Sequence, residues 1–345
     1  MLKAAVLGAT GNVGQIFVQL LEGHPWFKVT TVAASERSKG RTYGEASRWR
    51  QSTPIPEAVS PMEVVDIDPR AIKDVDIVFS ALPSAVAGKV EEAFANAGYV
   101  VVSNASAHRM DPDVPMLNPE INCSHVSLIE EQRKKRKWDG AIVTNPNCST
   151  TVLTLPLKPI YDMFGINSVI VSTMQALSGA GYPGVSSLDI MDNVIPFIGG
   201  EEPKMESETQ KILGTPSNPA DFKVSASCHR VATIDGHMEA VFVETIKKVE
   251  PNDVAEAMEN FVGEPQKLKL PSAPEKPIVV TWKKDRPQTR LDRMEGKGMS
   301  TVVGRIRKDF VLEGVKFIAL GHNTIRGAAG CGVLNAEYLK VKKFI

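Results

Sequence analysis

A glycine-rich turn near the N-terminus constrains the fold more than any other feature of the sequence. The apolar run 3–7 predicts a short buried strand that leads directly into glycines at positions 8, 11 and 14. Apolar residues then recur at helical spacing from 13 to 21. Glycines at such places let a pyrophosphate approach the free N–H groups at the start of the helix. The candidate cofactor residues of this unit are Gly8, Thr10, Gly11, Asn12 and Val13.

The spacing of these glycines, G-x-x-G-x-x-G, differs from the strict dinucleotide fingerprint G-x-G-x-x-G. A glycine motif is weak evidence when it stands alone. Its place in the first strand–turn–helix unit of the chain makes dinucleotide binding the favoured interpretation. A tight turn that binds no ligand is the alternative.

Alternating strand and helix patterns follow the turn. Such alternation predicts a doubly wound parallel sheet of the Rossmann-like α/β class. Ser84 follows one of the strands, at the end where these sheets place their ligands, so it is a further cofactor candidate. The strand patterns cover 29–34, 63–66, 75–81, 99–103 and 141–144, and a helix is expected at 85–97.

The loop after the second strand predicts which dinucleotide is bound. A carboxylate here favours the ribose 2′-hydroxyl of NAD, whereas arginine and hydroxyl donors suit the 2′-phosphate of NADP. Glu36 argues weakly for NAD, but Ser35, Arg37, Ser38 and Lys39 argue more strongly for NADP. A solvated polar loop is the alternative.

The composition excludes several classes of partner. Lys+Arg and Asp+Glu both count 40, which gives no reason to expect nucleic acid or an anionic membrane as a partner. No apolar run reaches membrane-spanning length, and the first residues carry no signal-peptide pattern. The 4 cysteines fit neither a zinc site nor a disulfide framework. We therefore expect a cytoplasmic protein with reduced thiols and no bound metal.

The segment 144–150, Thr-Asn-Pro-Asn-Cys-Ser-Thr, carries the candidate nucleophile. Pro146 prevents a central strand from continuing, and the residues after it predict a buried helix. Cys148 is then expected at a helix N-terminus, where free N–H groups and the helix dipole favour a thiolate. A small buried cysteine beside an ordinary helix cap is the alternative.

The second half of the chain has a different pattern of predicted strands and helices. Strand-like runs with a helix at 201–213 and another at 251–262 predict an α+β domain with a largely antiparallel sheet. An Ala-rich helix from 323 to 338 is expected to pack back onto the first domain. We therefore divide the chain into an NADP-binding domain at 1–147, completed by 324–345, and a catalytic domain at 148–323. The strand-like runs are 169–175, 224–226, 231–234, 239–243, 278–280 and 300–303.

A helix-start cysteine needs a group that can carry a proton. The segment 230–237 is expected to form a short strand and turn with Arg230 and His237 at its two ends. A neutral imidazole can take a thiol proton and return it, and a guanidinium fork suits a carboxylate. A hydrogen-bonded structural role is the alternative for any single histidine.

Taken together, the separated motifs resemble those of the aspartate-semialdehyde dehydrogenase family, in the branch found in archaea and fungi. The resemblance extends over essentially the whole chain. It implies NADPH-dependent, reversible reductive dephosphorylation of L-aspartyl-4-phosphate to L-aspartate 4-semialdehyde, on the way to lysine, threonine and methionine. It also implies a homodimer or homotetramer built through the second domain, so that 148–323 is expected to be both a catalytic and a dimerisation domain. The segments that carry the resemblance are 8–14, 35–38, 145–150, 175–181, 201–209, 230–237 and 323–330.

The resemblance also implies roles for single residues. Cys148 is expected to form a thioacyl-enzyme, with His237 as general acid/base and Gln175 orienting the acyl group. Arg230 is expected to bind the substrate α-carboxylate and Glu202 its ammonium group.

For the phosphoryl group or free phosphate, the resemblance implies Lys204 and Arg109, helped by Asn118. Asn323 is expected to face the nicotinamide, and a glycine-rich loop is expected to let its backbone approach the cofactor. The cofactor candidates in that loop are Ser178, Gly179 and Gly181.

Two other functions stay open. A paralogous archaeal branch, which reduces malonyl-CoA and related thioesters such as succinyl-CoA, resembles the chain in fold, glycine motif and the 230–237 segment. In that branch the two asparagines before the nucleophile are replaced, whereas Asn145, Asn147 and the 201–204 sequence are retained here. The second alternative is a nucleotide-binding regulator that kept the fold and lost the chemistry.

Overall fold

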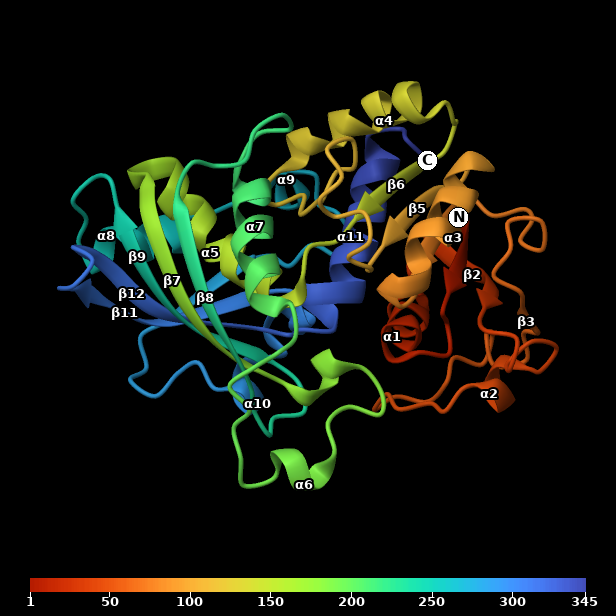
Figure 1. Ribbon diagram of the computed structural model, residues 1–345, viewed down its shortest axis with the longest axis horizontal. Helices are drawn as coiled ribbons and strands as arrows, with labels where there is room; N and C mark the ends of the chain where they lie inside the picture. Colours follow the sequence, from red (N-terminus) through yellow and green to blue (C-terminus); the bar gives the residue numbers. More distant parts are fainter.

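The computed structural model describes residues 1–345 and contains two six-stranded sheets (Figure 1). The first sheet has the order β3-β2-β1-β4-β5-β6, and every neighbouring pair in it is parallel. The predicted doubly wound parallel sheet is therefore confirmed. Its strands are β1 (Leu2–Leu7), β2 (Phe27–Ala33), β3 (Val64–Val65), β4 (Ile77–Ser80), β5 (Val100–Ser103) and β6 (Ala141–Thr144).

Helices cover both faces of this sheet, because its strands are apolar on both sides. Side chains of α1 and α4 belong to the core on one face, and those of α3 belong to the core on the other. The expected helix after the glycine turn is confirmed as α1. The helical segments of this half are α1 (Asn12–Leu21), α2 (Tyr43–Ala46), α3 (Ser84–Asn96), the 3₁₀ helix η1 (Cys123–Ser127) and α4 (Leu128–Arg136).

The turn between β1 and α1 depends on two of its glycines. Gly8 has φ of +71°, a conformation that residues with a Cβ rarely adopt. A Cβ on Gly14 would lie 2.2 Å from the carbonyl oxygen of Gly8, so only glycine lets α1 pack this closely against the strand end. The turn thereby brings the start of α1 to the carboxyl edge of the sheet.

The second sheet has the order β10-β11-β12-β9-β7-β8. Three of its pairs are antiparallel and two, β7 with β8 and β10 with β11, are parallel, so the sheet is mixed. The strand β12 was not predicted from the sequence. The strands are β7 (Ile166–Gln175), β8 (Lys223–Arg230), β9 (His237–Thr245), β10 (Ile278–Thr281), β11 (Thr301–Asp309) and β12 (Gly314–Gly321).

Helices α5 and α7 pack with one face of the second sheet in a common core (Figure 1). The structure gives α7 the predicted bounds, Glu201–Leu213. The other helical segments are α5 (Cys148–Phe164), η2 (Leu177–Ala180), α6 (Ser187–Ile190), α8 (Pro251–Glu259), α9 (Glu264–Lys267), α10 (Thr289–Asp292) and η3 (Glu295–Gly298). No helix is both long and apolar enough to cross a membrane.

The C-terminal segment returns to the first sheet. It consists of a π-helix, η4 (Ile325–Ala329), and α11 (Gly330–Val341). Val333, Leu334 and Leu339 lie in the same core cluster as β1, β2 and β5. Figure 1 shows α11 between the two sheets, so the last helix contributes to the core of the first domain as expected.

One predicted strand is wrong. Residues 231–234 do not pair in the sheet but belong to a loop at 231–236. Arg230 is the last residue of β8, and His237 is the first residue of β9. The loop therefore joins two strands and brings both side chains to the same end of the second sheet.

Candidate active site

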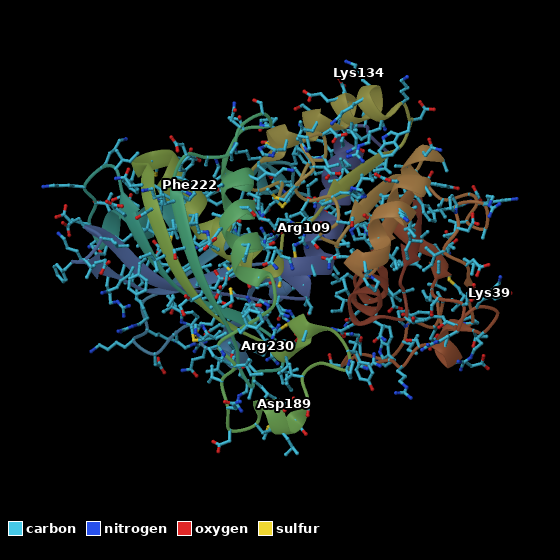
Figure 2. The ribbon with its side chains drawn as sticks, in the orientation of Figure 1. Lys39, Arg109, Lys134, Asp189, Phe222 and Arg230 are labelled. Atoms are coloured by element: carbon cyan, nitrogen blue, oxygen red, sulfur yellow. The ribbon has the colours of Figure 1, made fainter.

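A cavity of about 480 Å³ lies where the two domains meet. Figure 2 shows Arg109 and Arg230 in this central region, and Lys39 at the outer edge of the first domain. Twelve of the predicted site residues line the cavity, although they come from both domains. They are Asn12, Val13, Ser84, Arg109, Cys148, Gln175, Ser178, Gly179, Gly181, Lys204, Arg230 and Asn323.

Cys148 is the first residue of α5, which confirms its predicted place at a helix start. Asn147 caps the helix, since its Oδ1 accepts hydrogen bonds from the backbone N–H groups of Ser149 and Thr150 at 2.9 and 3.2 Å. On the other side lies Gly327 of η4, where a Cβ would come within 2.7 Å of the Cys148 Cβ. The sulfur is thus held between a capped helix and the π-helix.

His237 is fully buried and contacts the sulfur directly. Its Nε2 lies 3.3 Å from Sγ of Cys148, and its Nδ1 accepts a 3.0 Å hydrogen bond from the backbone N–H of Ala176. Because a backbone N–H can only donate, the neutral ring must carry its proton on Nε2, facing the sulfur. Burial, with Arg230 and His322 nearby, lowers the pKa of His237 to about 3, so the ring is neutral at pH 7.

The thiol of Cys148 differs from the sequence expectation. Burial raises its pKa to about 12, and the nearby carboxylate of Glu201 adds to the rise. Arg109, Arg230 and the backbone N–H of Ser149 lower the pKa but do not offset the burial. The helix N-terminus is present as predicted, yet desolvation of the thiolate outweighs it in the protein without ligands.

Two predicted residues at the ends of neighbouring strands face the cavity. Arg230 is 6% exposed, and its Nη1 donates a 2.6 Å hydrogen bond to the carbonyl oxygen of Ala176. Gln175 ends β7 directly beside Arg230, and its amide donates to Thr173 Oγ1 at 3.3 Å. Gln175 and Arg230 therefore form one wall of the cavity, close to the sulfur.

Two cations form another part of the wall. Arg109 comes from the loop after β5; its Nη1 donates to Oε1 of Glu208 at 3.0 Å and its Nη2 to the carbonyl oxygen of Asn104 at 2.9 Å. Its buried Nε has no partner. Lys204 enters from α7. Together they offer positive charge to an anionic ligand.

Glu202 and Asn118 do not line the cavity, contrary to the sequence expectation. The Oε1 of Glu202 accepts a 3.0 Å hydrogen bond from the backbone N–H of Cys228 on β8. Asn118 is fully buried, and its Oδ1 accepts a 3.1 Å hydrogen bond from Arg326. One oxygen of each side chain is therefore bound by the protein itself, whereas the buried Nδ2 of Asn118 has no partner.

Glu201, which was not predicted, lines the cavity instead of Glu202. Its Oε1 accepts a 2.8 Å hydrogen bond from Nδ2 of Asn147. Residues three apart on a helix point in directions about 60° apart, whereas residues two apart differ by about 160°. Since Lys204 faces the cavity, helical spacing alone favours Glu201 over Glu202, and this signal was available in the sequence.

The start of α1 is prepared for an anion. The helix has no capping side chain and no acidic residue in its first turn, so its first N–H groups are free for a ligand. Gly8, Thr10 and Gly11 form the turn that presents this helix, with a 3.0 Å hydrogen bond from Gly11 N to Gly8 O. Asn12 and Val13 reach the cavity from its first turn.

Asn323 and the glycine-rich loop form a further part of the cavity wall, which hydrogen bonds connect. Asn323 accepts a 2.8 Å hydrogen bond from the backbone N–H of Gly236 and donates one of 2.8 Å to Ser178 Oγ. A Cβ on Gly179 would lie 3.1 Å from the His237 ring and 3.0 Å from Arg230. Even an alanine at 179 would require these two side chains to shift, which favours glycine at this position.

The predicted ribose loop lies in a turn after β2. Ser38 donates its backbone N–H to Ser35 O at 2.8 Å, and the side chain of Arg37 is exposed and makes no ion pair or hydrogen bond. Lys39, in contrast, is paired with Asp66. Arg37 is therefore the free cation of this turn.

Comparison with known proteins identifies the family. The semialdehyde dehydrogenase NAD-binding domain matches residues 3–129, and the semialdehyde dehydrogenase dimerisation domain matches residues 157–326. The aspartate-semialdehyde dehydrogenase of Methanothermobacter thermautotrophicus is 56% identical over 344 residues, which cover 98% of this chain and 99% of that protein. A malonyl-CoA reductase (NADP) of Metallosphaera sedula is 48% identical over 352 residues, 100% of this chain and 98% of that protein.

A solved structure agrees with these relatives. The crystal structure of aspartate-semialdehyde dehydrogenase with NADP from Candida albicans has a TM-score of 0.92, with 42% identity over 100% of both chains. The chain belongs to the semialdehyde dehydrogenase family, in the branch that contains the archaeal and fungal aspartate-semialdehyde dehydrogenases.

Proposed function

We propose that this protein is an NADP-dependent aspartate-semialdehyde dehydrogenase, which reduces L-aspartyl-4-phosphate to L-aspartate 4-semialdehyde and releases phosphate. The observation that carries the proposal is the 3.3 Å contact between Cys148 Sγ and His237 Nε2, in a cavity that Arg109, Lys204 and Arg230 make cationic. The substrate carries a carboxylate and a phosphate, so it requires several cations near one nucleophile.

The residues present fit NADP. The uncapped start of α1 and the bare turn at Gly8 suit the pyrophosphate, and the exposed, unpaired Arg37 suits the 2′-phosphate, with Ser35 and Ser38 as hydroxyl donors. When bound, NADPH supplies the hydride that reduces the acyl carbon. Ser84, Ser178, Gly179, Gly181 and Asn323 would hold its nicotinamide end against the sulfur.

The chain's own residues account for the other steps. Cys148 Sγ attacks the acyl carbon, the bond from that carbon to the phosphate oxygen breaks, and a thioester forms on Cys148, while the thiol proton leaves with the departing phosphate. The Nε2–H of His237 stabilises the sulfur as a thiolate before attack and again when it leaves the reduced carbon as the semialdehyde is released. Gln175 orients the acyl oxygen, and Arg109 with Lys204 binds the departing phosphate.

Recognition of the aspartate skeleton involves two further groups. Arg230 binds the α-carboxylate with its guanidinium fork, a role supported by its position in the cavity lining. We assign the ammonium group to Glu201, because this carboxylate lines the cavity whereas Glu202 is bound to the backbone of β8. Its hydrogen bond from Asn147 fixes the orientation of that carboxylate beside the nucleophile.

The alternative is a reductase of malonyl-CoA or a related thioester such as succinyl-CoA, and the Metallosphaera sedula relative favours it. Malonate semialdehyde has no α-ammonium group, so Glu201 would have no partner in that substrate. The discriminating experiment measures NADP⁺ reduction with aspartate semialdehyde plus phosphate and with malonate semialdehyde plus CoA. Turnover only with the second pair would overturn the proposal, and no turnover with either would favour a non-catalytic nucleotide-binding protein.

The proposed function also involves a division into two domains and assembly into a homo-oligomer. We infer an NADP-binding domain at 1–147 with 324–345 and a catalytic and dimerisation domain at 148–323, assembled as a homodimer or homotetramer. The matching dimerisation-domain model supports assembly, as do exposed apolar side chains such as Leu188 and Phe197. The four cysteines are all free thiols, which suits the reducing cytoplasm as the location of this oligomer. Light scattering on the purified protein measures the oligomeric state.

A further inference from the structure

Helix α7 presents a row of polar side chains to the active site. Glu201, Lys204, Glu208 and Lys211 follow one another at helical spacing, and each contacts the cavity or a segment that supplies a residue to it. Glu208 is the most buried of the four, at 1% exposure. It does not line the cavity, so its contacts with other residues define what it can do.

Each oxygen of the Glu208 carboxylate binds a different part of the site. Oε1 accepts from Nη1 of Arg109 at 3.0 Å, and Oε2 accepts from the backbone N–H of Asn147 at 2.6 Å. Arg109 belongs to the loop after β5 in the first domain, and Asn147 is the cap of the helix that begins with Cys148. Figure 2 shows Arg109 beside α7, at the centre of the molecule.

We propose that Glu208 is a positioning residue that fixes the guanidinium of Arg109 relative to the sulfur of Cys148. In an acyl phosphate a single oxygen joins the acyl carbon to the phosphorus, so the nucleophile and the phosphate-binding cation must keep a fixed separation. Arg109 and Asn147 come from distant parts of the chain and share this one carboxylate. This inference rests on the proposed function, in which Arg109 binds phosphate.

Only a carboxylate can make both contacts. Arg109 and the Asn147 N–H are both donors, and an ionised glutamate has two acceptor oxygens. Glutamine has the same shape but one acceptor and one NH₂ group, so its NH₂ would face one of the two donors. Glu208→Gln must therefore release either Arg109 or the Asn147 backbone.

The loop that carries Arg109 is also anchored by a second residue of α7, Lys211. Lys211 Nζ donates to the carbonyl oxygens of Arg109, Asp111 and Val114 at 2.5, 2.9 and 3.2 Å, so the loop backbone stays anchored when Glu208 changes. The predicted defect is therefore an Arg109 side chain that keeps its hydrogen bond to the carbonyl oxygen of Asn104 but is no longer fixed relative to Cys148, not a displaced loop.

The test compares Glu208→Gln with the matched control Glu206→Gln. Glu206 lies on the same helix, and its Oε1 accepts a 3.1 Å hydrogen bond from the backbone N–H of Ala226, away from the cavity. Initial rates of NADP⁺ reduction are measured with aspartate semialdehyde while inorganic phosphate is varied. We expect Glu208→Gln to raise the KM for phosphate about fivefold or more and to leave the KM for NADP⁺ within about twofold of wild type. A phosphate KM equal to that of Glu206→Gln would overturn the proposal.

A double-mutant comparison separates positioning from general damage. Because Glu208 acts on phosphate through Arg109, Glu208→Gln should raise the phosphate KM by less than about twofold in an Arg109→Ala background. Equal effects in both backgrounds would contradict the proposal. If Glu208→Gln does not fold, Glu208→Asp keeps two acceptor oxygens and is expected to have a phosphate KM closer to wild type than Glu208→Ala; equal values would also contradict it.

A measurement without turnover keeps this inference distinct from the proposed function. Inorganic phosphate should slow the alkylation of Cys148 by iodoacetamide, since bound phosphate lies next to the sulfur. Glu208→Gln should require about fivefold more phosphate for the same protection. Equal protection in the two proteins would overturn the role of Glu208, even if aspartate semialdehyde proves not to be a substrate. Protection in wild type without phosphate-dependent turnover would overturn the proposed reaction alone.

Discussion

The backbone N–H of Ala176 donates a 3.0 Å hydrogen bond to Nδ1 of His237, so the imidazole presents its Nε2–H to the sulfur of Cys148. The ring cannot accept the thiol proton at Nε2 while it holds this tautomer. Protonation at Nδ1 would break the bond to Ala176 and place a buried cation beside Arg230. In the protein without ligands, His237 therefore donates a hydrogen bond from Nε2–H to the sulfur of Cys148.

This arrangement predicts the pH dependence of His237. Its pKa is lowered to about 3, below the usual value near 6.5, so the unfolded chain binds a proton that the folded protein does not. The stability that it contributes is present above pH 6.5 and is lost as pH falls toward 3. In His237→Asn we expect the acid-side decline of the melting temperature to be shallower than in wild type. An identical decline, or an imidazole that titrates near 6.5 by NMR, would contradict the assignment.

The same variant tests catalysis. Loss of the hydrogen bond from His237 to the sulfur, as opposed to loss of a nucleophile, should lower kcat by about 10²–10⁴-fold and leave residual activity. The KM for the semialdehyde should stay nearly unchanged, because His237 lies outside the cavity lining. A loss of kcat below about threefold would assign the role to another residue.

Cys148 should react slowly with iodoacetamide at neutral pH. Its thiol pKa is raised to about 12, so the thiolate fraction grows about tenfold per pH unit through neutrality. We expect the alkylation rate to rise in that proportion between about pH 7 and 10, with the label located by mass spectrometry. A rate that levels off near pH 7 would show that the helix N-terminus outweighs burial after all.

Replacement of the sulfur separates chemistry from binding. Cys148→Ala should abolish turnover and leave the affinity for NADPH unchanged, since the thioester requires sulfur at this position. A mass-tagged acyl donor should label Cys148 and none of the other three cysteines, of which Cys228 and Cys331 are buried. Acyl label on another cysteine would overturn the nucleophile assignment.

The two neighbouring glutamates should behave differently. Glu201→Gln should raise the KM for aspartate semialdehyde by several-fold to about a hundredfold, because about 1–3 kcal/mol of charge-assisted hydrogen bonding to the ammonium is lost. A substrate analogue without the amino group should be affected much less. Glu202→Gln, which alters a contact with the β8 backbone, should show no such discrimination. If Glu202→Gln discriminates between the two substrates and Glu201→Gln does not, then Glu202 binds the ammonium group.

Cofactor preference depends on an exposed cation. Arg37→Ala should weaken NADPH binding far more than NADH binding, because only the 2′-phosphate loses a partner. Dissociation constants from fluorescence titration measure both. Equal losses would point to a structural role for Arg37 and favour Glu36 as a ribose ligand for NAD.

Local chemistry made much of this protein predictable from its sequence. The turn at Gly8, the helix that begins at Cys148 and the bounds of α7 follow from periodicity, glycine and the Asn147 cap, which act within one or two turns of backbone. The parallel sheet follows from alternating strands and helices, because short connections leave few topologies.

The tertiary structure decided which side chains meet and in which charge state. His237 reaches Cys148 across 89 positions, and Arg109 reaches Glu208 across 99, so no local pattern reports these contacts. Asn118 has an amide side chain that could bind a phosphate, but its Oδ1 accepts a hydrogen bond from Arg326. The pKa of Cys148 also depends on long-range packing, because desolvation by the surrounding fold outweighs the local helix N-terminus that the sequence correctly predicted.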